Sequence, residues 1–184
     1  MDWIQNLDFS ILMFVQEHVR SSFFNDFWRG ITFLGESGWI WIVSGVLLLF
    51  FKKYRKTGFT ALLALLLGFL ITNICLKNMV GRVRPYDTYE ALIPLISKPG
   101  DWSFPSGHSC SSFAAAFVYA RCLPRCYGIA ALVLAGLIAF SRLYLGVHYP
   151  TDILGGILVG LLSGGLALWM VRAMKRKIMA RSGN

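Results

Sequence analysis

Residues 57–76 read TGFTALLALLLGFLITNICL, twenty residues without a charged side chain. A helix of about twenty predominantly apolar residues is long enough to cross the hydrocarbon core of a bilayer. Basic residues flank the run, with Arg55 and Lys56 before it and Lys77 directly after it. The stretch therefore predicts a membrane-spanning helix.

The composition of the whole chain agrees with a membrane protein. Of the 184 residues, 56% are hydrophobic and 15% are charged, whereas a soluble domain carries about 25% charged residues. The length fits one domain. These proportions disfavour intrinsic disorder, a disulfide scaffold and a cytosolic enzyme.

Four further apolar stretches predict spanning helices, at about 34–51, 105–120, 127–145 and 150–172. Residues 3–19 place apolar side chains at helical spacing, which predicts an amphipathic helix in the membrane interface, followed by a short helix over 23–33. A sixth, poorly hydrophobic span is the alternative. We expect an all-α polytopic membrane bundle of five to six helices, with interfacial helices in 1–34, a transmembrane domain in 35–175 and a basic tail in 176–184. The sequence does not indicate which oligomeric state the protein adopts.

The charge distribution predicts the orientation of this bundle. The chain has 18 Lys and Arg against nine Asp and Glu, a net charge of +9. Basic clusters at 52–56, 121–125 and 172–181 fall at alternate ends of the spans, and the positive-inside rule assigns them to the cytoplasm. We expect the opposite ends to face outward from a bacterial inner membrane. The clusters then contact anionic lipid heads, and nucleic acid is not an expected partner.

The cysteines indicate packing residues and no metal site. Cys75, Cys110, Cys122 and Cys126 lie in or beside apolar runs, and the Cys122-x3-Cys126 pair has no second pair of Cys or His residues downstream to complete a zinc site. We expect neither a metal nor another cofactor.

The first of three polar clusters on the outer side is Lys77-x6-Arg84-Pro85. Seven residues are close to two helical turns, so Lys77 and Arg84 are expected on one helix face. Two cations directed at one point suit an anion, and the alternative is a pair of interfacial cations whose charges reach water. Arg82 is interpreted as an interfacial cation of this kind.

The second cluster is Pro105-Ser106-Gly107-His108. A helix start offers free backbone N–H groups and the positive end of the helix dipole, and glycine permits close approach, so this is a candidate anion site. His108 would stand at its edge. The alternative is a helix start with a buried, hydrogen-bonded histidine.

The third cluster is Ser141-Arg142-x5-His148-x3-Asp152. His148 and Asp152 are four residues apart across a helix start, so the carboxylate can accept a hydrogen bond from one ring nitrogen and orient the other. That arrangement is typical of a nucleophile and its orienting group. Arg142 adds a guanidinium whose geometry suits phosphate oxygens.

In this order and on outer helix ends, the three clusters resemble the signature of the type 2 phosphatidic acid phosphatase (PAP2) superfamily. The resemblance covers residues 77–152 by motif and implies a membrane-embedded all-α core and a lipid phosphatase. It implies that His148 attacks phosphorus to form a phosphohistidine, that Asp152 holds its tautomer, and that His108 protonates the leaving oxygen. The groups that would stabilise the phosphate oxygens are Lys77, Arg84, Ser106, Gly107 and Arg142.

The expected substrate is a lipid phosphate at the outer face. Undecaprenyl diphosphate ranks first, because this carrier is released on the outer leaflet; phosphatidylglycerophosphate and phosphatidic acid are the alternatives. The segment 85–105, rich in aromatic and acidic residues, is a candidate specificity element or an interfacial belt. A lipid phosphotransferase, which would pass the phosphoryl group to a second lipid, remains an alternative function. The apolar spans disfavour a soluble vanadate-binding haloperoxidase, and the histidines disfavour a non-enzymatic lipid carrier.

Overall fold

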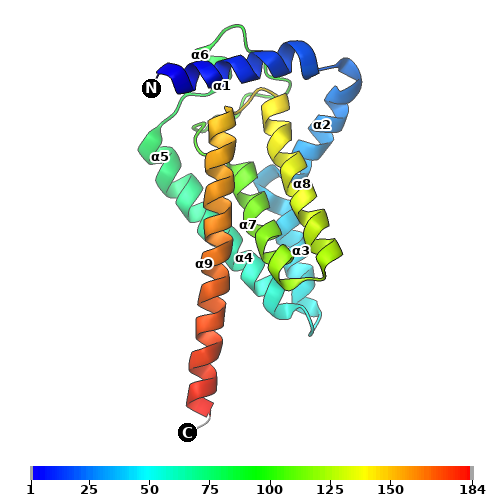
Figure 1. The fold of residues 1–184 in the computed structure, drawn as a ribbon, viewed down its shortest axis with the longest axis vertical. Helices are drawn as coiled ribbons and strands as arrows, with labels where there is room; N and C mark the ends of the chain where they lie inside the picture. The colour runs from blue at the N-terminus through cyan, green and yellow to red at the C-terminus, as the bar shows by residue number, and fades with distance from the viewer. Residues whose placement is uncertain (1, 183–184) are drawn as a thin grey trace.

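The computed structural model describes residues 2–182, which are largely helical and contain no strand. Most helices run along one common axis, while α1 lies across one end of the bundle (Figure 1). This all-helical membrane fold confirms the predicted class. The helices are α1 (Asp2–Phe14, continued by a π-helical segment Val15–Val19), α2 (Ser22–Leu34), a 3-10 turn (Glu36–Gly38), α3 (Trp39–Phe50), α4 (Arg55–Phe69, continued by a π-helical segment Leu70–Leu76), α5 (Lys77–Val80), α6 (Pro85–Thr88), α7 (Gly107–Cys122), α8 (Arg125–Tyr144) and α9 (Pro150–Ser182).

Three helical units in the described chain are long and apolar enough to cross a membrane, namely residues 55–88, α8 and α9. A fourth candidate is a bent pair, α2 with the segment 36–50, whose axes meet at 41°. The bend follows from the backbone at its centre, because Ser37 and Gly38 both adopt positive φ, at 49° and 68°. We predicted that the first span starts near Leu34, whereas this candidate begins at Ser22.

The small helix α7 forms the centre of the bundle. It is only 16 residues long, and Ala114, Ala115 and Ala116 are completely buried in the principal core. Its neighbour α9 approaches through the Gly156-x3-Gly160-x3-Gly164 motif: a Cβ on Gly160 would lie 2.5 Å from the carbonyl oxygen of Cys110. The sequence predicted close helix packing by these glycines, and the structure shows α7 as the partner.

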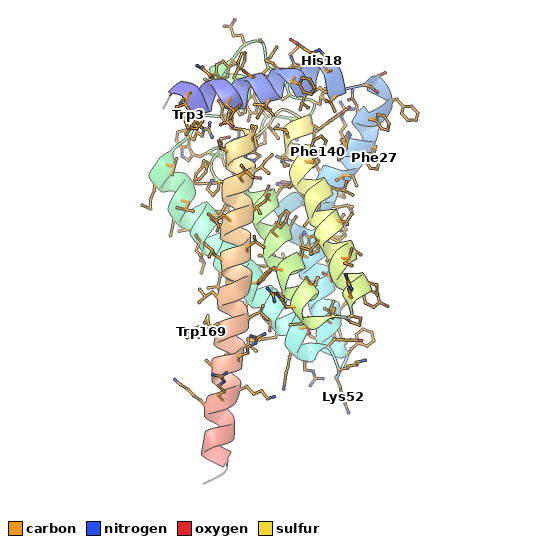
Figure 2. All side chains as sticks on the ribbon, viewed as in Figure 1. Trp3, His18, Phe27, Lys52, Phe140 and Trp169 are labelled. Atoms are coloured by element: carbon orange, nitrogen blue, oxygen red, sulfur yellow. The ribbon has the colours of Figure 1, made fainter. Side chains whose placement is uncertain are left out.

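The outer surface of the bundle is apolar, as expected for side chains that face lipid. On α9 the leucines at 154, 158, 162 and 166 are exposed at a spacing of one helical turn, opposite the glycine face. Large apolar side chains cover the periphery of the helices in Figure 2. This burial pattern corrects one prediction: Cys110 is buried, but Cys75, Cys122 and Cys126 are exposed and do not pack the core.

The two ends of the bundle differ in charge. We call the end with the 51–54 turn, the α7–α8 turn and the C-terminal part of α9 the basic end, because the three Lys and Arg clusters lie there. The other end, where α1 crosses, we call the site end. Helix α9 continues without a break through Ser182, so residues 176–182 of the predicted tail are helical, while 183–184 lie outside the described residues.

Candidate active site

A cavity of about 780 Å³ opens at the site end and brings the three predicted clusters together. Two more predicted residues, Ser106 and Asp152, are completely buried beside it. The predicted residues that line the cavity directly are Lys77, Arg84, Gly107, His108, Arg142 and His148.

His148 and Asp152 form the predicted pair. His148 lies in the loop before α9 and is 2% exposed. Its Nδ1 is 3.4 Å from Oδ2 of Asp152, and its Nε2 is 3.3 Å from a guanidinium nitrogen of Arg84. We assign the proton to Nδ1, because the carboxylate accepts it and a guanidinium can only donate to Nε2. The lone pair of Nε2 then faces the guanidinium of Arg84, and both residues line the cavity.

Burial also keeps His148 neutral. Desolvation lowers the pKa of its imidazole to about 3 against the raising effect of the Asp152 hydrogen bond, and Arg84 and Arg142 lower it further. A neutral imidazole carries the lone pair that a nucleophile needs. The site therefore holds a neutral imidazole whose Nε2 does not have to lose a proton, as the predicted nucleophile requires.

Asp152 is held by more groups than the sequence indicated. Its Oδ2 accepts hydrogen bonds from the Tyr149 N–H at 2.9 Å and from the Ser103 hydroxyl at 2.5 Å. Its Oδ1 pairs with Arg82 at 2.7 Å. The prediction that Arg82 is an interfacial cation with its charge in water is wrong, because this guanidinium binds the carboxylate that orients His148.

Arg82 connects the site to the N-terminal helix. Its second nitrogen pairs with Asp8 of α1 at 2.7 Å, and its guanidinium stacks 3.8 Å from the ring centroid of Tyr149. Asp8 is 1% exposed and also accepts a hydrogen bond from the Thr151 N–H at the start of α9. Sequence reasoning missed Asp8 as a site residue; the available signal was an acid that interrupts the apolar pattern of residues 3–15.

Lys77 and Arg84 converge, but by a different route from the predicted one. The helix ends at Val80 because Gly81 adopts φ 59°, and Arg84 follows in extended backbone. The two cations therefore do not share a helix face. Instead both bind Asp101 of the 85–105 segment: Lys77 contacts Oδ2, and Arg84 donates to Oδ1 at 2.6 Å.

The Asp101 carboxylate therefore sits between two cations of the predicted phosphate site. Partial burial raises its pKa, but Lys77 and Arg84 outweigh this effect and lower the pKa to about 2. The side chain is 52% exposed, so it can move into solvent. An anion that binds both cations has to compete with this carboxylate.

The start of α7 supplies the second cluster. Ser106 is the N-cap, and its hydroxyl accepts a hydrogen bond from the Ser109 N–H at 3.4 Å. Gly107 follows as the first helical residue, where N–H groups have no partner within the helix. A Cβ at Gly107 would lie 4.0 Å from the ammonium of Lys77, so this backbone faces the cation site. The serine side chain serves the helix cap and is not among the cavity-lining residues, whereas Gly107 and His108 line the cavity.

His108 faces a carboxylate that the sequence did not single out. Its Nε2 is buried, has no hydrogen-bond partner among the described residues, and lies 3.6 Å from the carboxylate of Glu36. Glu36 comes from the bend between α2 and α3. Gly35 makes the approach possible, because a Cβ there would lie 2.9 Å from Cδ2 of His108.

Arg142 completes the cation set from the last turn of α8. It is 2% exposed and donates a hydrogen bond to the hydroxyl of Thr32 in α2 at 2.7 Å. Its Nε has no hydrogen-bond partner among residues 2–182. A buried guanidinium with spare donors suits a multivalent anion.

Among the described residues, no group of three His, Cys, Asp or Glu residues is arranged to hold a metal ion.

Comparisons with known proteins point to one family. The sequence matches the family model of the PAP2 superfamily over residues 57–176. An undecaprenyl-diphosphatase from Sulfolobus acidocaldarius is 32% identical over 132 residues, which are 71% of this chain but only 64% of that protein. Phosphatidylglycerophosphatase B from Bacillus subtilis is 34% identical over 87% of this chain and 79% of that protein.

A solved structure extends the similarity to the fold. The crystal structure of a transmembrane PAP2 type phosphatidylglycerolphosphate phosphatase from Bacillus subtilis matches with a TM-score of 0.76 at 31% identity. The match covers 97% of this chain and 89% of that chain. The similarity therefore includes the N-terminal helices that carry no sequence motif.

Proposed function

The chain belongs to the PAP2 superfamily, and on that premise we propose that it is a membrane phosphatase that removes phosphate from a lipid phosphate or diphosphate through a phosphohistidine. The observation that carries the proposal is the shape of the cavity. Its polar end holds two histidines and three cations, and its other wall consists of apolar side chains of α3 and α4.

The apolar wall supports a lipid as the substrate. Ile42, Leu66 and Phe69 line the cavity, and they are 44%, 53% and 54% exposed although they belong to the helices α3 and α4 of the bundle. These residues connect the cavity to the lipid-facing surface between α3 and α4. A substrate can keep its tail in the membrane while its phosphate reaches His148.

The first chemical step is attack by Nε2 of His148 on phosphorus. The N–P bond forms as the bond from phosphorus to the leaving oxygen breaks, and that oxygen takes the electron pair and a proton from protonated His108. Lys77, Arg84 and Arg142 stabilise the charge on the other phosphate oxygens, which is the main task in phosphoryl transfer.

The second step regenerates the enzyme. Water attacks phosphorus, neutral His108 takes a proton from it, and the N–P bond breaks to release phosphate. The imidazole returns to its starting state with the proton on Nδ1, held by Asp152. Arg82 and Asp8 act through Asp152: they fix the carboxylate so that His148 keeps this tautomer and direction.

The orientation of the chain favours one substrate. With the basic end in the cytoplasm, the cavity opens at the outer face of a bacterial inner membrane, where undecaprenyl diphosphate is released. We therefore rank it first, with phosphatidylglycerophosphate and phosphatidic acid as alternatives. The names of the relatives support both of the first two substrates, since one is an undecaprenyl-diphosphatase and another a phosphatidylglycerophosphatase.

A substrate panel tests this ranking. Purified protein in detergent is given the three lipids at equal concentration, and the specificity constant for phosphate release is compared. We expect the highest value for undecaprenyl diphosphate; equal values for all three lipids would contradict the ranking. A parallel reaction with a lipid alcohol as acceptor tests the phosphotransferase alternative, which predicts a new lipid phosphate in place of free phosphate.

A further inference from the structure

A second cavity lies at the basic end, far from the histidines. It has a volume of about 670 Å³ and is bounded by the end of α7 and the C-terminal half of α9. Asp152 and Arg172 are twenty residues apart on α9, which corresponds to about 30 Å of helix. That length equals the thickness of a hydrocarbon core, so the two cavities lie at opposite headgroup levels.

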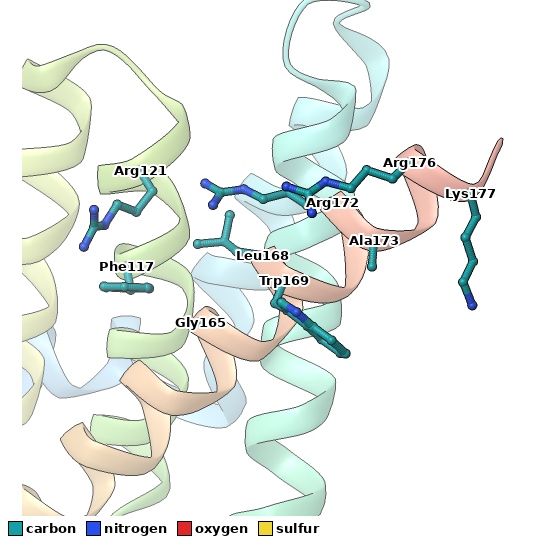
Figure 3. A pocket seen from close by; sticks show the side chains of 9 residues that line it. All are labelled: Phe117, Arg121, Gly165, Leu168, Trp169, Arg172, Ala173, Arg176 and Lys177. Carbon is teal, nitrogen blue, oxygen red and sulfur yellow. The ribbon is translucent and has the colours of Figure 1, made fainter. Parts of the chain in front are cut away.

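Three guanidinium groups share this cavity. Arg172 and Arg176 extend to one side of α9, toward the end of α7 that carries Arg121, whereas Lys177 extends away from them (Figure 3). Arg121 is held over the ring of Phe117, with 5.1 Å between its guanidinium carbon and the ring centroid. The three arginines therefore line one cavity from two helices, Arg172 and Arg176 from α9 and Arg121 from the end of α7.

Nothing of opposite charge in the described chain compensates these arginines. None of the nine Asp and Glu residues falls in segments 50–57, 120–127 or 168–182, which make up the basic end. Two like charges one helical turn apart, as at Arg172 and Arg176, are mutually unfavourable. The positive-inside rule explains why basic residues lie at this end, but it does not explain why three of them line one cavity.

The rest of the cavity is apolar. Phe117, Leu168 and Trp169 form its lining beside the arginines, and Trp169 is 66% exposed on the lipid-facing surface. Exposed tryptophan is typical of the level where acyl chains meet headgroups. A ligand that fits both parts has a phosphate group for the guanidinium groups and an apolar chain for the aromatic side.

We propose that this cavity binds an anionic phospholipid of the leaflet at the basic end, with its phosphate between Arg121, Arg172 and Arg176 and an acyl chain along Leu168 and Trp169. Planar guanidinium groups bind phosphate oxygens in pairs, and basic pockets between helices at this membrane level suit such headgroups. The bound lipid joins α7 to α9, the same two helices that hold His108 and Asp152 at the other end.

The test measures thermal unfolding of the purified full-length chain in detergent. Phosphatidylglycerol is titrated in, with zwitterionic phosphatidylcholine and inorganic phosphate as separate arms. We expect a saturable rise in melting temperature with phosphatidylglycerol alone. An equal rise with phosphatidylcholine would contradict an anionic site, and an equal rise with inorganic phosphate would contradict a lipid ligand.

Matched variants locate the effect. The triple variant R121Q/R172Q/R176Q is expected to lose at least four fifths of the phosphatidylglycerol shift, while K52Q/K53Q/K56Q, with the same charge change at the same end, keeps it. Equal loss in both variants would show a general charge effect and overturn the proposal. Retention in both would place the lipid elsewhere, for instance in the catalytic cavity, and overturn it too.

Single substitutions cover the case in which the triple variant does not fold. Arg172 and Arg176 are exposed side chains, so R172Q and R176Q leave the core intact. Each is expected to weaken the lipid response at least threefold in apparent affinity, and phosphate release by the same samples reports that the site end is folded. An unchanged response in both single variants would contradict the site.

Discussion

Arg82 pairs with Asp152 at 2.7 Å through Oδ1, while the other oxygen of the same carboxylate faces Nδ1 of His148 at 3.4 Å. His148, the proposed nucleophile, is thus linked through Asp152 and Arg82 to Asp8 of α1. Because each group in this series is held in place by the next one, a substitution at Asp8 is expected to change the orientation of His148.

The first prediction concerns Asp8. Asp8→Asn removes the negative charge that Arg82 binds, and we expect kcat to fall about tenfold, equivalent to about 1.4 kcal/mol of lost transition-state stabilisation, with KM almost unchanged. The reason is that Asp8 touches no substrate and acts only through the direction of His148. Steady-state kinetics on a lipid diphosphate measure both constants.

The control for Asp8 is Asp26→Asn, which removes an equivalent ion pair with Arg29 at the exposed surface, where Asp26 is 88% exposed. Exposed pairs contribute little, so this variant is expected to behave like the wild type. If Asp8→Asn raises KM and leaves kcat intact, the positioning role is wrong.

The variant Arg82→Lys keeps the positive charge, but its ammonium can bind only one of the two carboxylates well. Its kcat is expected to lie between those of Arg82→Gln and the wild type.

The second prediction concerns the anion already present in the cation site. Asp101→Asn removes a carboxylate that both Lys77 and Arg84 bind, so inorganic phosphate is expected to inhibit the variant at a several-fold lower concentration. Product-inhibition constants measure the effect. Asp87→Asn is the matched control, because Asp87 lies in the same segment and its ion pair in the described chain is with exposed Lys98. A larger inhibition constant for phosphate in Asp101→Asn would contradict this prediction. It would mean that the carboxylate helps to build the phosphate site.

The third prediction follows from the pKa of His148, which burial lowers to about 3. A lowered histidine pKa means that the neutral form persists as pH falls. The stability of the fold is expected to decrease as pH falls from the unfolded value of about 6.5 to about 3, and the loss remains below pH 3. Nitrogen NMR of labelled protein, with His148→Gln to assign the signal, should show a neutral ring at pH 5. A ring that becomes charged near pH 6.5 would contradict a buried nucleophile.

The fourth prediction concerns the packing that brings α7 to α9. Gly160→Ala places a methyl group 2.5 Å from the Cys110 carbonyl oxygen and 3.0 Å from the Ala114 amide nitrogen. Backbone atoms cannot yield as a side chain can, so we expect a loss of about 1–3 kcal/mol and a lower melting temperature. Gly165→Ala on the same helix meets nothing within 4 Å and should not lower it. Equal melting temperatures would contradict the helix contact.

Much of this architecture could be predicted from the sequence. The apolar interior of the bilayer requires long apolar helices, and basic residues gather at the ends of such helices, so both features are visible in the sequence. The pairing of His148 with Asp152 could be predicted too, since four residues across a helix start set their separation locally. The bend at Ser37 could not, because a positive φ at a serine is imposed by its surroundings. For this reason Glu36, which the bend places beside His108, was missed.

The role of Arg82 shows the other limit of sequence reasoning. An arginine near a membrane surface is ordinarily solvated, and its partner Asp8 lies 74 residues away in the chain. Only the fold of α1 across the bundle brings these charges together. The prediction that Lys77 and Arg84 share a helix face was wrong for a local reason, since Gly81 ends the helix between them.

One measurement tests the central claim most directly: transfer of labelled phosphate from a lipid diphosphate to the protein in the presence of EDTA. We expect an acid-labile phosphohistidine in the wild type, and its absence together with all phosphate release in His148→Ala. Phosphate release that survives in His148→Ala, or that EDTA abolishes in the wild type, would contradict the phosphohistidine mechanism.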